Sequence, residues 1–253
     1  MAELFQTLFY QPILNLLVFL YNIIPGNDIG IAIIALTALI RLILFPLNQQ
    51  SIKSQKSLQE IQPKIEELKK QYGSNKQDLG KAMMELYKEQ KVNPFSSCLP
   101  LLIQFPFLIA VFYVFRDGLT GGSLDLVYNF IQRPDAINVI TLGFFDLSKP
   151  SPVLAVLAGL AQFWQAKMMI AKRPPKQVQG KPGAKDEDMM AIMNKQVIYF
   201  MPAITVFIGL TFPGGLTLYW LTTTLLMGLQ QVYIFKKDKT RKSTNLSINN
   251  TNE

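Results

Sequence analysis

The sequence predicts an all-α polytopic membrane protein with five transmembrane helices, a cytoplasmic helical hairpin and an N-terminal helix lying in the membrane interface. Three observations predict this fold. Only 17% of the 253 residues are charged, whereas about 25% are charged in soluble domains. The charges are kept out of several long apolar runs. Lys and Arg gather in alternate connections between those runs, as in proteins that cross a membrane repeatedly.

The composition also excludes several kinds of catalytic site. The chain has no histidine and one cysteine, Cys98, which removes histidine-based catalysis, intrachain disulfides and the usual zinc sites. Residues 73–82 do not match a phosphate-binding loop either. Six residues instead of four separate Gly73 from Gly80-Lys81, and Ala82 stands where Ser or Thr would hold magnesium. We therefore expect no enzyme activity, cofactor or metal.

Residues 1–28 are expected to form an external interfacial amphipathic helix. The stretch is apolar, but Gln, Asn, Thr and Pro are scattered through its first 24 residues, which favours a helix in the membrane surface. A sixth span is the alternative. No Lys or Arg precedes the apolar part, so the basic region of a signal peptide is missing.

Five apolar runs have about the roughly 17–25 residues that a helix needs to cross a hydrocarbon core. We predict spans at 29–47, 98–115, 152–171, 197–213 and 214–235. Lys167 lies near the end of the third span, where its side chain can extend to the interface. The last two spans are separated only by Pro213-Gly214-Gly215, which predicts a tight turn between antiparallel helices.

The basic residues predict the orientation. They are concentrated in three segments and sparse in two: nine in 48–97, seven in 167–196 and five in the tail 236–253, against none in 1–28 and three in the external loop 116–151. The positive-inside rule then places the N-terminus outside and the C-terminus and the loop 172–196 in the cytoplasm. This topology, with no transit peptide, favours a bacterial plasma membrane.

The cytoplasmic segment 48–97 predicts two amphipathic helices joined by a turn at Gly73-Ser74-Asn75. A stripe of residues spaced by three or four lies on each side of that turn: Leu58, Ile61, Ile65, Leu68 and Tyr72, then Leu79, Met83, Leu86 and Gln90. Such a hairpin either covers the cytoplasmic mouth of the bundle or receives a partner.

The basic tail 236–253 is expected to be irregular beyond about Lys242. It is a topology signal or, alternatively, a site for anionic lipid headgroups or ribosomal RNA.

Arg41 is the only charge in the middle of a clear span, and no span contains an Asp or Glu to pair with it. An arginine at the centre of a membrane helix makes insertion of that helix less favourable by about 2.5–3.5 kcal/mol. Because Leu47 is only six residues away, snorkelling of Arg41 to the cytoplasmic interface is one interpretation. The other, which we favour, is a water-filled cavity facing the cytoplasmic leaflet.

Polar residues in every span favour the cavity. Thr37 lies one turn from Arg41 on the same helix face, and the other spans contribute Gln104, Gln162, Gln165, Thr205, Thr222, Thr223 and Thr224. Each alone is explained by a helix-packing hydrogen bond, but together with an unpaired arginine they fit a hydrated groove better than a dry core. Tyr219 and Trp220 are either interface anchors or aromatic side chains that face this groove.

The chain resembles the YidC family of membrane insertases, whose relatives work in mitochondria and chloroplasts. The resemblance covers residues 10–116 and 212–231 and rests on three stretches: YQPILNLLVFLYNIIPGNDIGIAIIALTALIRLILFPLNQQSIKSQKSLQEIQPKIEELKKQY, LYKEQKVNPFSSCLPLLIQFPFLIAVFYVFR and FPGGLTLYWLTTTLLMGLQQ. It implies five spans around a hydrophilic groove that is open to the cytoplasm and to lipid but closed on the outside. The residues it places in the groove are Arg41, Trp220 beside Tyr219 as the substrate-contacting aromatic, Gln104 and Gln162; we add Thr37 and Thr223 from the polar pattern.

The resemblance also implies what the protein acts on. Nascent membrane proteins would be received in the groove and released sideways into the bilayer, alone or with the Sec translocon. The hairpin and tail would contact the ribosome and the signal recognition particle, and membrane lipids would surround the spans. A small anion transporter or channel with Arg41 as its ligand site is the alternative, although no inverted repeat supports it. A lateral chaperone that only assists the Sec translocon is a third interpretation.

Overall fold

The computed structural model describes residues 2–73, 75–93, 99–117, 124–169 and 196–250, and these are almost entirely helical. The helices, in chain order, are α1 (Ala2–Phe5), η1 (Gln6–Tyr10), α2 (Gln11–Ile23), α3 (Ile29–Ile43), α4 (Phe45–Glu60), α5 (Gln62–Tyr72), α6 (Lys76–Glu89), α7 (Leu99–Asp117), η4 (Leu124–Leu126), α8 (Pro152–Met169), η5 (Gln196–Phe200), α10 (Met201–Thr211) and α11 (Gly214–Asn250). Two short antiparallel strands, β1 (Ile140–Thr141) and β2 (Phe145–Asp146), form the one sheet in the described ranges.

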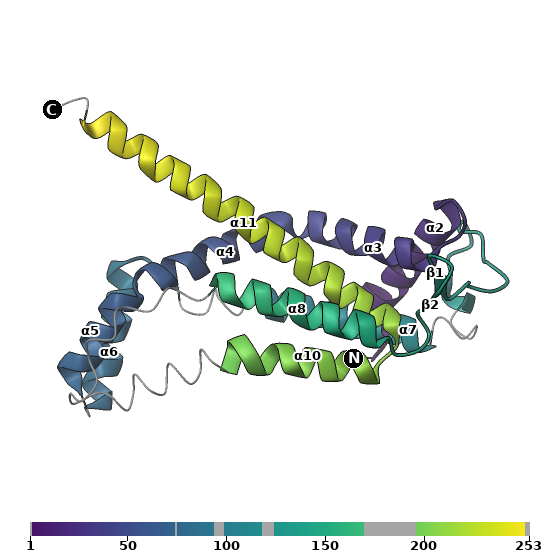
Figure 1. Ribbon diagram of the computed structural model, residues 1–253, viewed down its shortest axis with the longest axis horizontal. Coiled ribbons are helices and arrows are strands. Elements are labelled where there is room, and N and C mark those ends of the chain that lie inside the picture. Colours follow the sequence, from purple (N-terminus) through teal and green to yellow (C-terminus); the bar gives the residue numbers. More distant parts are fainter. Residues whose placement is uncertain (1, 74, 94–98, 118–123, 170–195, 251–253) are drawn as a thin grey trace.

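The long helices form a bundle with different structures at its two ends (Figure 1). Helix α8 packs against α10 and α11, and α11 packs against α3. Helix α2 and the β1–β2 hairpin lie at one end, whereas α5 and α6 extend from the other end. The main core joins α2, α3, α7 and α11, with Leu14, Leu17, Ile33 and Tyr219 among its most buried side chains.

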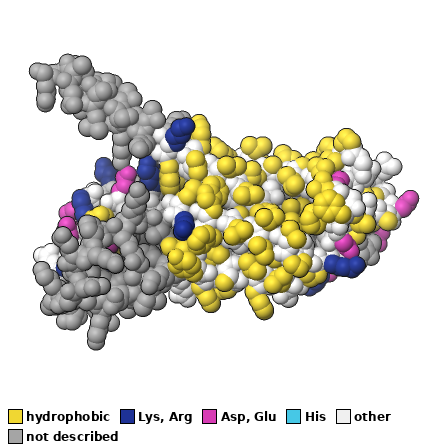
Figure 2. All heavy atoms as spheres, in the orientation of Figure 1, with side chains coloured by type: hydrophobic (Ala, Val, Ile, Leu, Met, Phe, Trp, Pro, Cys, Tyr) yellow, Lys and Arg dark blue, Asp and Glu magenta, His cyan; other side chains and the backbone are white. Residues whose placement is uncertain are grey.

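Apolar side chains cover the middle of the bundle surface. Figure 2 shows hydrophobic groups across the centre of the visible face and charged groups gathered at its two ends. The exposed apolar residues come from several helices and include Ile34 and Leu42 of α3, Leu160 of α8 and Phe207 of α10. A broad apolar surface flanked by charge is what a bilayer solvates.

Length and apolar character alone qualify one described helix to cross a membrane, Glu3–Ile23. The pair Ile29–Ile43 and Phe45–Tyr72 qualifies together but is bent by 68°, and Ile198–Thr211 is a shorter apolar helix. The count of five spans therefore stays a prediction, as does the choice between an interfacial helix and a sixth span for residues 1–28.

The structure differs from the predicted span 29–47 near its end. Helix α3 stops at Ile43, and α4 begins at Phe45 in a new direction. The physical reason is Pro46, in the first turn of α4. Because proline has no N–H, it cannot donate the hydrogen bond to Leu42 that a continuous helix needs.

The tail also differs from its prediction. Helix α11 continues to Asn250, well past Lys242, where an irregular chain was expected. No Gly or Pro follows Gly228, so the sequence offers no residue that would break the helix. The other predicted cytoplasmic connection, 172–196, lies outside the described residues except for its last position.

Helices α5 and α6 pack against each other through a small apolar core of their own. Ile61, Ile65 and Leu86 are buried there, and Leu58 and Met83 pack around them. These residues belong to the two stripes in the sequence. Asn75 caps the start of α6: its side chain accepts a hydrogen bond from the backbone N–H of Asp78, a standard way to satisfy a helix N-terminus.

Candidate functional site

Arg41 lies near the end of α3 and is 7% exposed. None of the ion pairs formed within the described ranges includes it. The guanidinium of Arg41 interacts electrostatically with Tyr219 of α11. A buried guanidinium without a carboxylate destabilises the fold, so its presence marks this position as a candidate site.

Tyr219 connects three helices at this site. Its side chain is 1% exposed, and its hydroxyl accepts a hydrogen bond from Nε2 of Gln104 on α7. Thr223, one turn further along α11, is buried beside this hydroxyl. Arg41, Gln104, Tyr219 and Thr223 therefore form one polar group in an otherwise apolar core.

Thr37 is buried on α3 one turn before Arg41, but its hydroxyl donates to the backbone oxygen of Ile33 at 2.6 Å. This bond stays within one helix. The hydroxyl oxygen keeps accepting capacity, so Thr37 adds polarity beside Arg41 without bonding to it.

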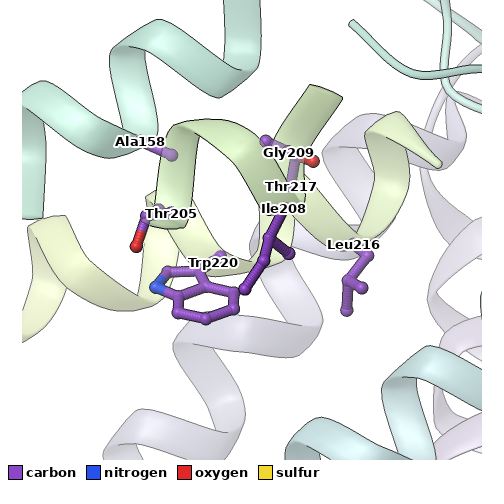
Figure 3. Close-up of a pocket in the computed structure, with 7 residues that line it drawn as sticks. All are labelled: Ala158, Thr205, Ile208, Gly209, Leu216, Thr217 and Trp220. Carbon is purple, nitrogen blue, oxygen red and sulfur yellow. The ribbon is translucent and has the colours of Figure 1, made fainter. Parts of the chain in front are cut away.

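Gln162 and Trp220 belong to a different place. The hydroxyl of Thr205 on α10 contacts Oε1 of Gln162 on α8, so this amide joins two helices. Trp220 lines a pocket between α8, α10 and α11, together with Ala158, Thr205, Ile208, Gly209, Leu216 and Thr217 (Figure 3). The space between these residues, including the part that is open to solvent, is about 200 Å³.

The predicted groove residues thus fall into two groups. Tyr219 and Trp220 are adjacent, and consecutive helical residues point about 100° apart. Tyr219 faces α3 and α7, whereas Trp220 faces α8 and α10. No group of three or more metal-binding side chains occurs in the ranges that the structure describes.

The sequence interpretation missed a second set of buried polar side chains near this site. Asn48 and Ser51 of α4 and Gln230 and Gln231 of α11 are all buried. Nε2 of Gln230 donates to the backbone oxygen of Phe45 at 3.2 Å. The available signal was two adjacent amides, Gln230-Gln231, inside the last apolar run.

These features are those of a helical membrane protein in which a buried arginine, without an ion pair in the described ranges, lies beside a buried tyrosine. The family described as "60Kd inner membrane protein" matches residues 19–242. A Fusobacterium nucleatum protein named "Membrane protein insertase YidC" is 36% identical over 230 residues, which is 90% of this chain and 97% of the relative. Proteins of the same name from Francisella tularensis subsp. novicida and subsp. tularensis are 37% identical over 204 residues, which is 80% of this chain and 31% of each relative.

The chain therefore belongs to the YidC family of bacterial inner membrane proteins. This confirms the family resemblance of the sequence.

Proposed function

We propose that this protein is a membrane protein insertase, which receives nascent membrane proteins in a hydrophilic groove and releases their apolar segments sideways into the bilayer. The observation that carries the proposal is the environment of Arg41, which is buried, forms no ion pair with any residue that the structure describes, and interacts with Tyr219, the partner of Gln104. Relatives over most of the chain bear the insertase name, which supports the same function.

The free energy of transferring a substrate segment into lipid can drive its insertion. A substrate segment of about 20 apolar residues gains roughly 6–12 kcal/mol on entering lipid, at about 0.3–0.6 kcal/mol per residue. Insertion therefore needs no nucleotide. The obstacle is the polar flank, whose unpaired backbone groups must cross the hydrocarbon. A polar groove that reaches partway through the bilayer shortens this path.

Arg41 would attract acidic residues in the flank. A contact between unit charges at 4 Å is worth about 4 kcal/mol at an effective dielectric of 20 and about 1 kcal/mol in water. The groove is hydrated in this proposal, so the lower value applies. The membrane potential adds about 2.3 kcal/mol per 100 mV for each acidic charge that moves outward.

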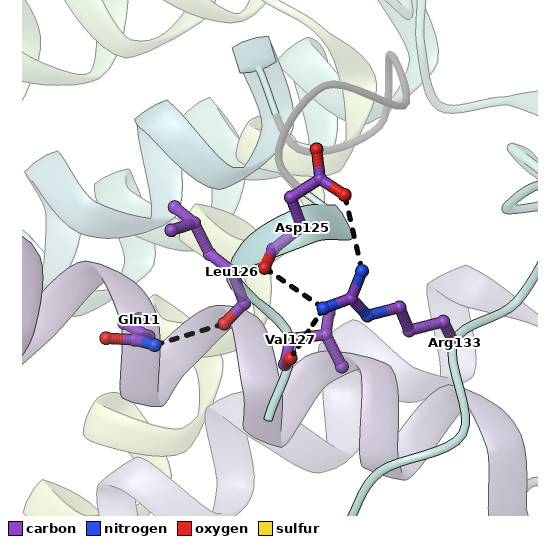
Figure 4. Close-up of polar contacts among 5 residues, drawn as sticks. All are labelled: Gln11, Asp125, Leu126, Val127 and Arg133. Carbon is purple, nitrogen blue, oxygen red and sulfur yellow. Dashed lines mark hydrogen bonds and ion pairs between the residues drawn. The ribbon is translucent and has the colours of Figure 1, made fainter. Parts of the chain in front are cut away.

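The proposed orientation has α2 on the outer surface and the α5–α6 hairpin in the cytoplasm. Hydrogen bonds run along α2 to the loop after α7: Gln11 and Asn15 donate to the oxygen of Leu126, and Asn22 donates to that of Gln132. Arg133 holds this loop by bonds to Asp125 and to the Val127 oxygen (Figure 4). Contact with one loop over about 16 Å of helix supports a position along the outer end of the bundle.

The hairpin and tail are the proposed contacts for the ribosome and the signal recognition particle, and the Sec translocon is a proposed partner at the lateral opening. These assignments rest on the basic composition of the two segments and on the family.

The test is insertion by the purified protein alone in liposomes, with a single-span substrate whose N-terminal flank is acidic. We expect protection of the flank from external protease above the level of empty liposomes. Arg41→Ala should reduce protection of the acidic flank far more than that of a matched neutral flank, and Arg41→Lys should retain activity. Leu42→Ala, on the exposed neighbour of Arg41, is the matched control.

Equal loss for both flanks in Arg41→Ala would contradict the charge mechanism. Absence of protection by folded protein, with recovery when the Sec translocon is added, would instead establish a chaperone that depends on Sec.

A further inference from the structure

The buried polar side chains where α4 crosses α11 form a cluster outside the Arg41 site. We name this cluster the amide crossing; it consists of Asn48, Ser51, Gln230 and Gln231, each at least nine-tenths buried. Buried side chains at a helix crossing are usually apolar. Four polar side chains therefore make this crossing unusually polar.

Contacts between α4 and α11 lie on both sides of the amide crossing. At one side, Nε2 of Gln230 donates to the Phe45 oxygen at 3.2 Å. At the other side, Nζ of Lys56 lies 5.7 Å from the centroid of the Phe235 ring. The stretch of α4 between Phe45 and Lys56 therefore lies against α11, and its buried face carries Asn48.

The amide of Asn48 is the unusual group in this cluster. The side chain is 2% exposed, and its Nδ2 has no hydrogen-bond partner in the described ranges. An unpaired buried donor destabilises the folded state, and an apolar residue would pack better. A donor held without a partner is available to a ligand that enters the crossing.

The position of Asn48 fits the path of a substrate. It follows Arg41 by seven residues, about two helical turns, across the bend between α3 and α4 and toward the α5–α6 end of the bundle. A polar flank that arrives from that end reaches the amide crossing before it reaches Arg41.

We propose that the amide crossing is a second binding site for the polar flank of the substrate, and that it recognises peptide amides whatever their charge. An extended peptide exposes N–H and C=O groups that need partners, and a carboxamide offers both a donor and an acceptor. Binding separates α4 from α11 and replaces the bond between Gln230 and Phe45 with bonds to the flank. Arg41 then selects acidic flanks, whereas Asn48 and Gln230 hold any flank. The inference rests on the proposed insertase function.

Disulfide trapping tests the contact directly. Because Cys98 is the single cysteine, Cys98→Ser provides a cysteine-free background. Asn48→Cys is combined with one cysteine moved along the substrate flank, and Gln50→Cys, on the exposed face of the same helix, is the matched control. We expect a disulfide during insertion at position 48 and none at position 50.

Insertion without a disulfide at position 48, for every flank position, would overturn this inference and leave the insertase function intact. Failure of the background protein to insert any substrate would overturn the insertase function and this inference with it.

The variant Asn48→Leu distinguishes a role of Asn48 in substrate binding from a role in helix packing. Because the change removes an unpaired buried donor, we expect the variant to melt at a temperature no lower than the parent. It should insert acidic and neutral flanks about fivefold more slowly, the effect of one neutral hydrogen bond of about 1 kcal/mol. Gln50→Leu should change neither property. An unchanged insertion rate, or a lower melting temperature together with lost insertion, would show that Asn48 serves packing alone.

Discussion

One carboxylate, that of Asp28, joins the start of α3 to the β1–β2 hairpin. Its Oδ1 accepts hydrogen bonds from the backbone N–H of Gly30 at 2.8 Å, from that of Ile31 at 3.1 Å, and from the Thr141 hydroxyl. Its Oδ2 accepts from the backbone N–H of Leu142 at 2.8 Å. The first two bonds cap the helix, and the other two tie it to a loop 113 residues later in the chain.

These bonds determine how much folding free energy the Asp28→Ala substitution should remove. Loss of the helix cap costs about 1 kcal/mol. Loss of the two other hydrogen bonds adds about 1–2 kcal/mol, less than the roughly 1.5–3 kcal/mol that each bond to a buried charge contributes, because the site is only half-buried and water can replace them. We expect a total of about 2–3 kcal/mol, which lowers the melting temperature by about 4–12 °C for a chain of this size.

The charge of Asp28 predicts a pH dependence. Burial by itself would raise the pKa of Asp28, but the hydrogen bonds from Thr141, Leu142, Ile31 and Gly30 outweigh it and lower the pKa. A carboxyl whose pKa is lower in the folded state stabilises the fold above its unfolded pKa of about 3.9, and this contribution is lost as the pH falls through the folded pKa. Asp28→Asn should therefore be less stable than the parent at pH 7, and the difference should vanish in acid.

Thermal unfolding in detergent, followed by the fluorescence of the two tryptophans, measures both effects. Asp135→Ala, at an exposed carboxyl of the same loop region, is the control and should leave the melting temperature unchanged. The reasoning is refuted if Asp28→Ala lowers it no more than Asp135→Ala, or if the deficit of Asp28→Asn is the same at pH 7 and pH 3.

Two further predictions concern the site and the hairpin. Tyr219→Phe removes the hydroxyl that accepts from Gln104 and leaves that amide unpaired, so melting in detergent should show a loss of about 1–3 kcal/mol; an unchanged melting temperature would contradict this bond. Ile65→Ala should cost about 2–4 kcal/mol within the α5–α6 core, seen as faster amide hydrogen exchange in these helices and not in α3. Met84→Ala, on an exposed neighbour, should leave exchange unchanged.

The sequence was sufficient for the all-helical class, the family and the candidate Arg41. These depend on features that do not need the tertiary structure: apolar runs of defined length, and one charge with no opposite charge in any run. The apolar stripes of segment 48–97 likewise follow from local periodicity, because residues three and four apart share a helix face.

The separation of Tyr219 from Trp220 could not be predicted in this way. The two residues are adjacent, and only the rotation of α11 against its neighbours decides that one contacts Gln104 and the other lines the pocket with Thr205. Gln162 illustrates the same point, since the sequence predicts only a polar residue in a span, whereas the packing of α8 against α10 decides that its amide meets Thr205.

The features of this protein that follow from its sequence are local: the apolar runs, the apolar helix faces and the single charge in the middle of a run. Which distant groups meet depends on how the helices pack. The bond from Gln230 of α11 to Phe45, the first residue of α4, joins residues that are 185 positions apart in the chain. Periodicity and propensity act over a few residues, whereas such contacts are set by the angles at which whole helices pack.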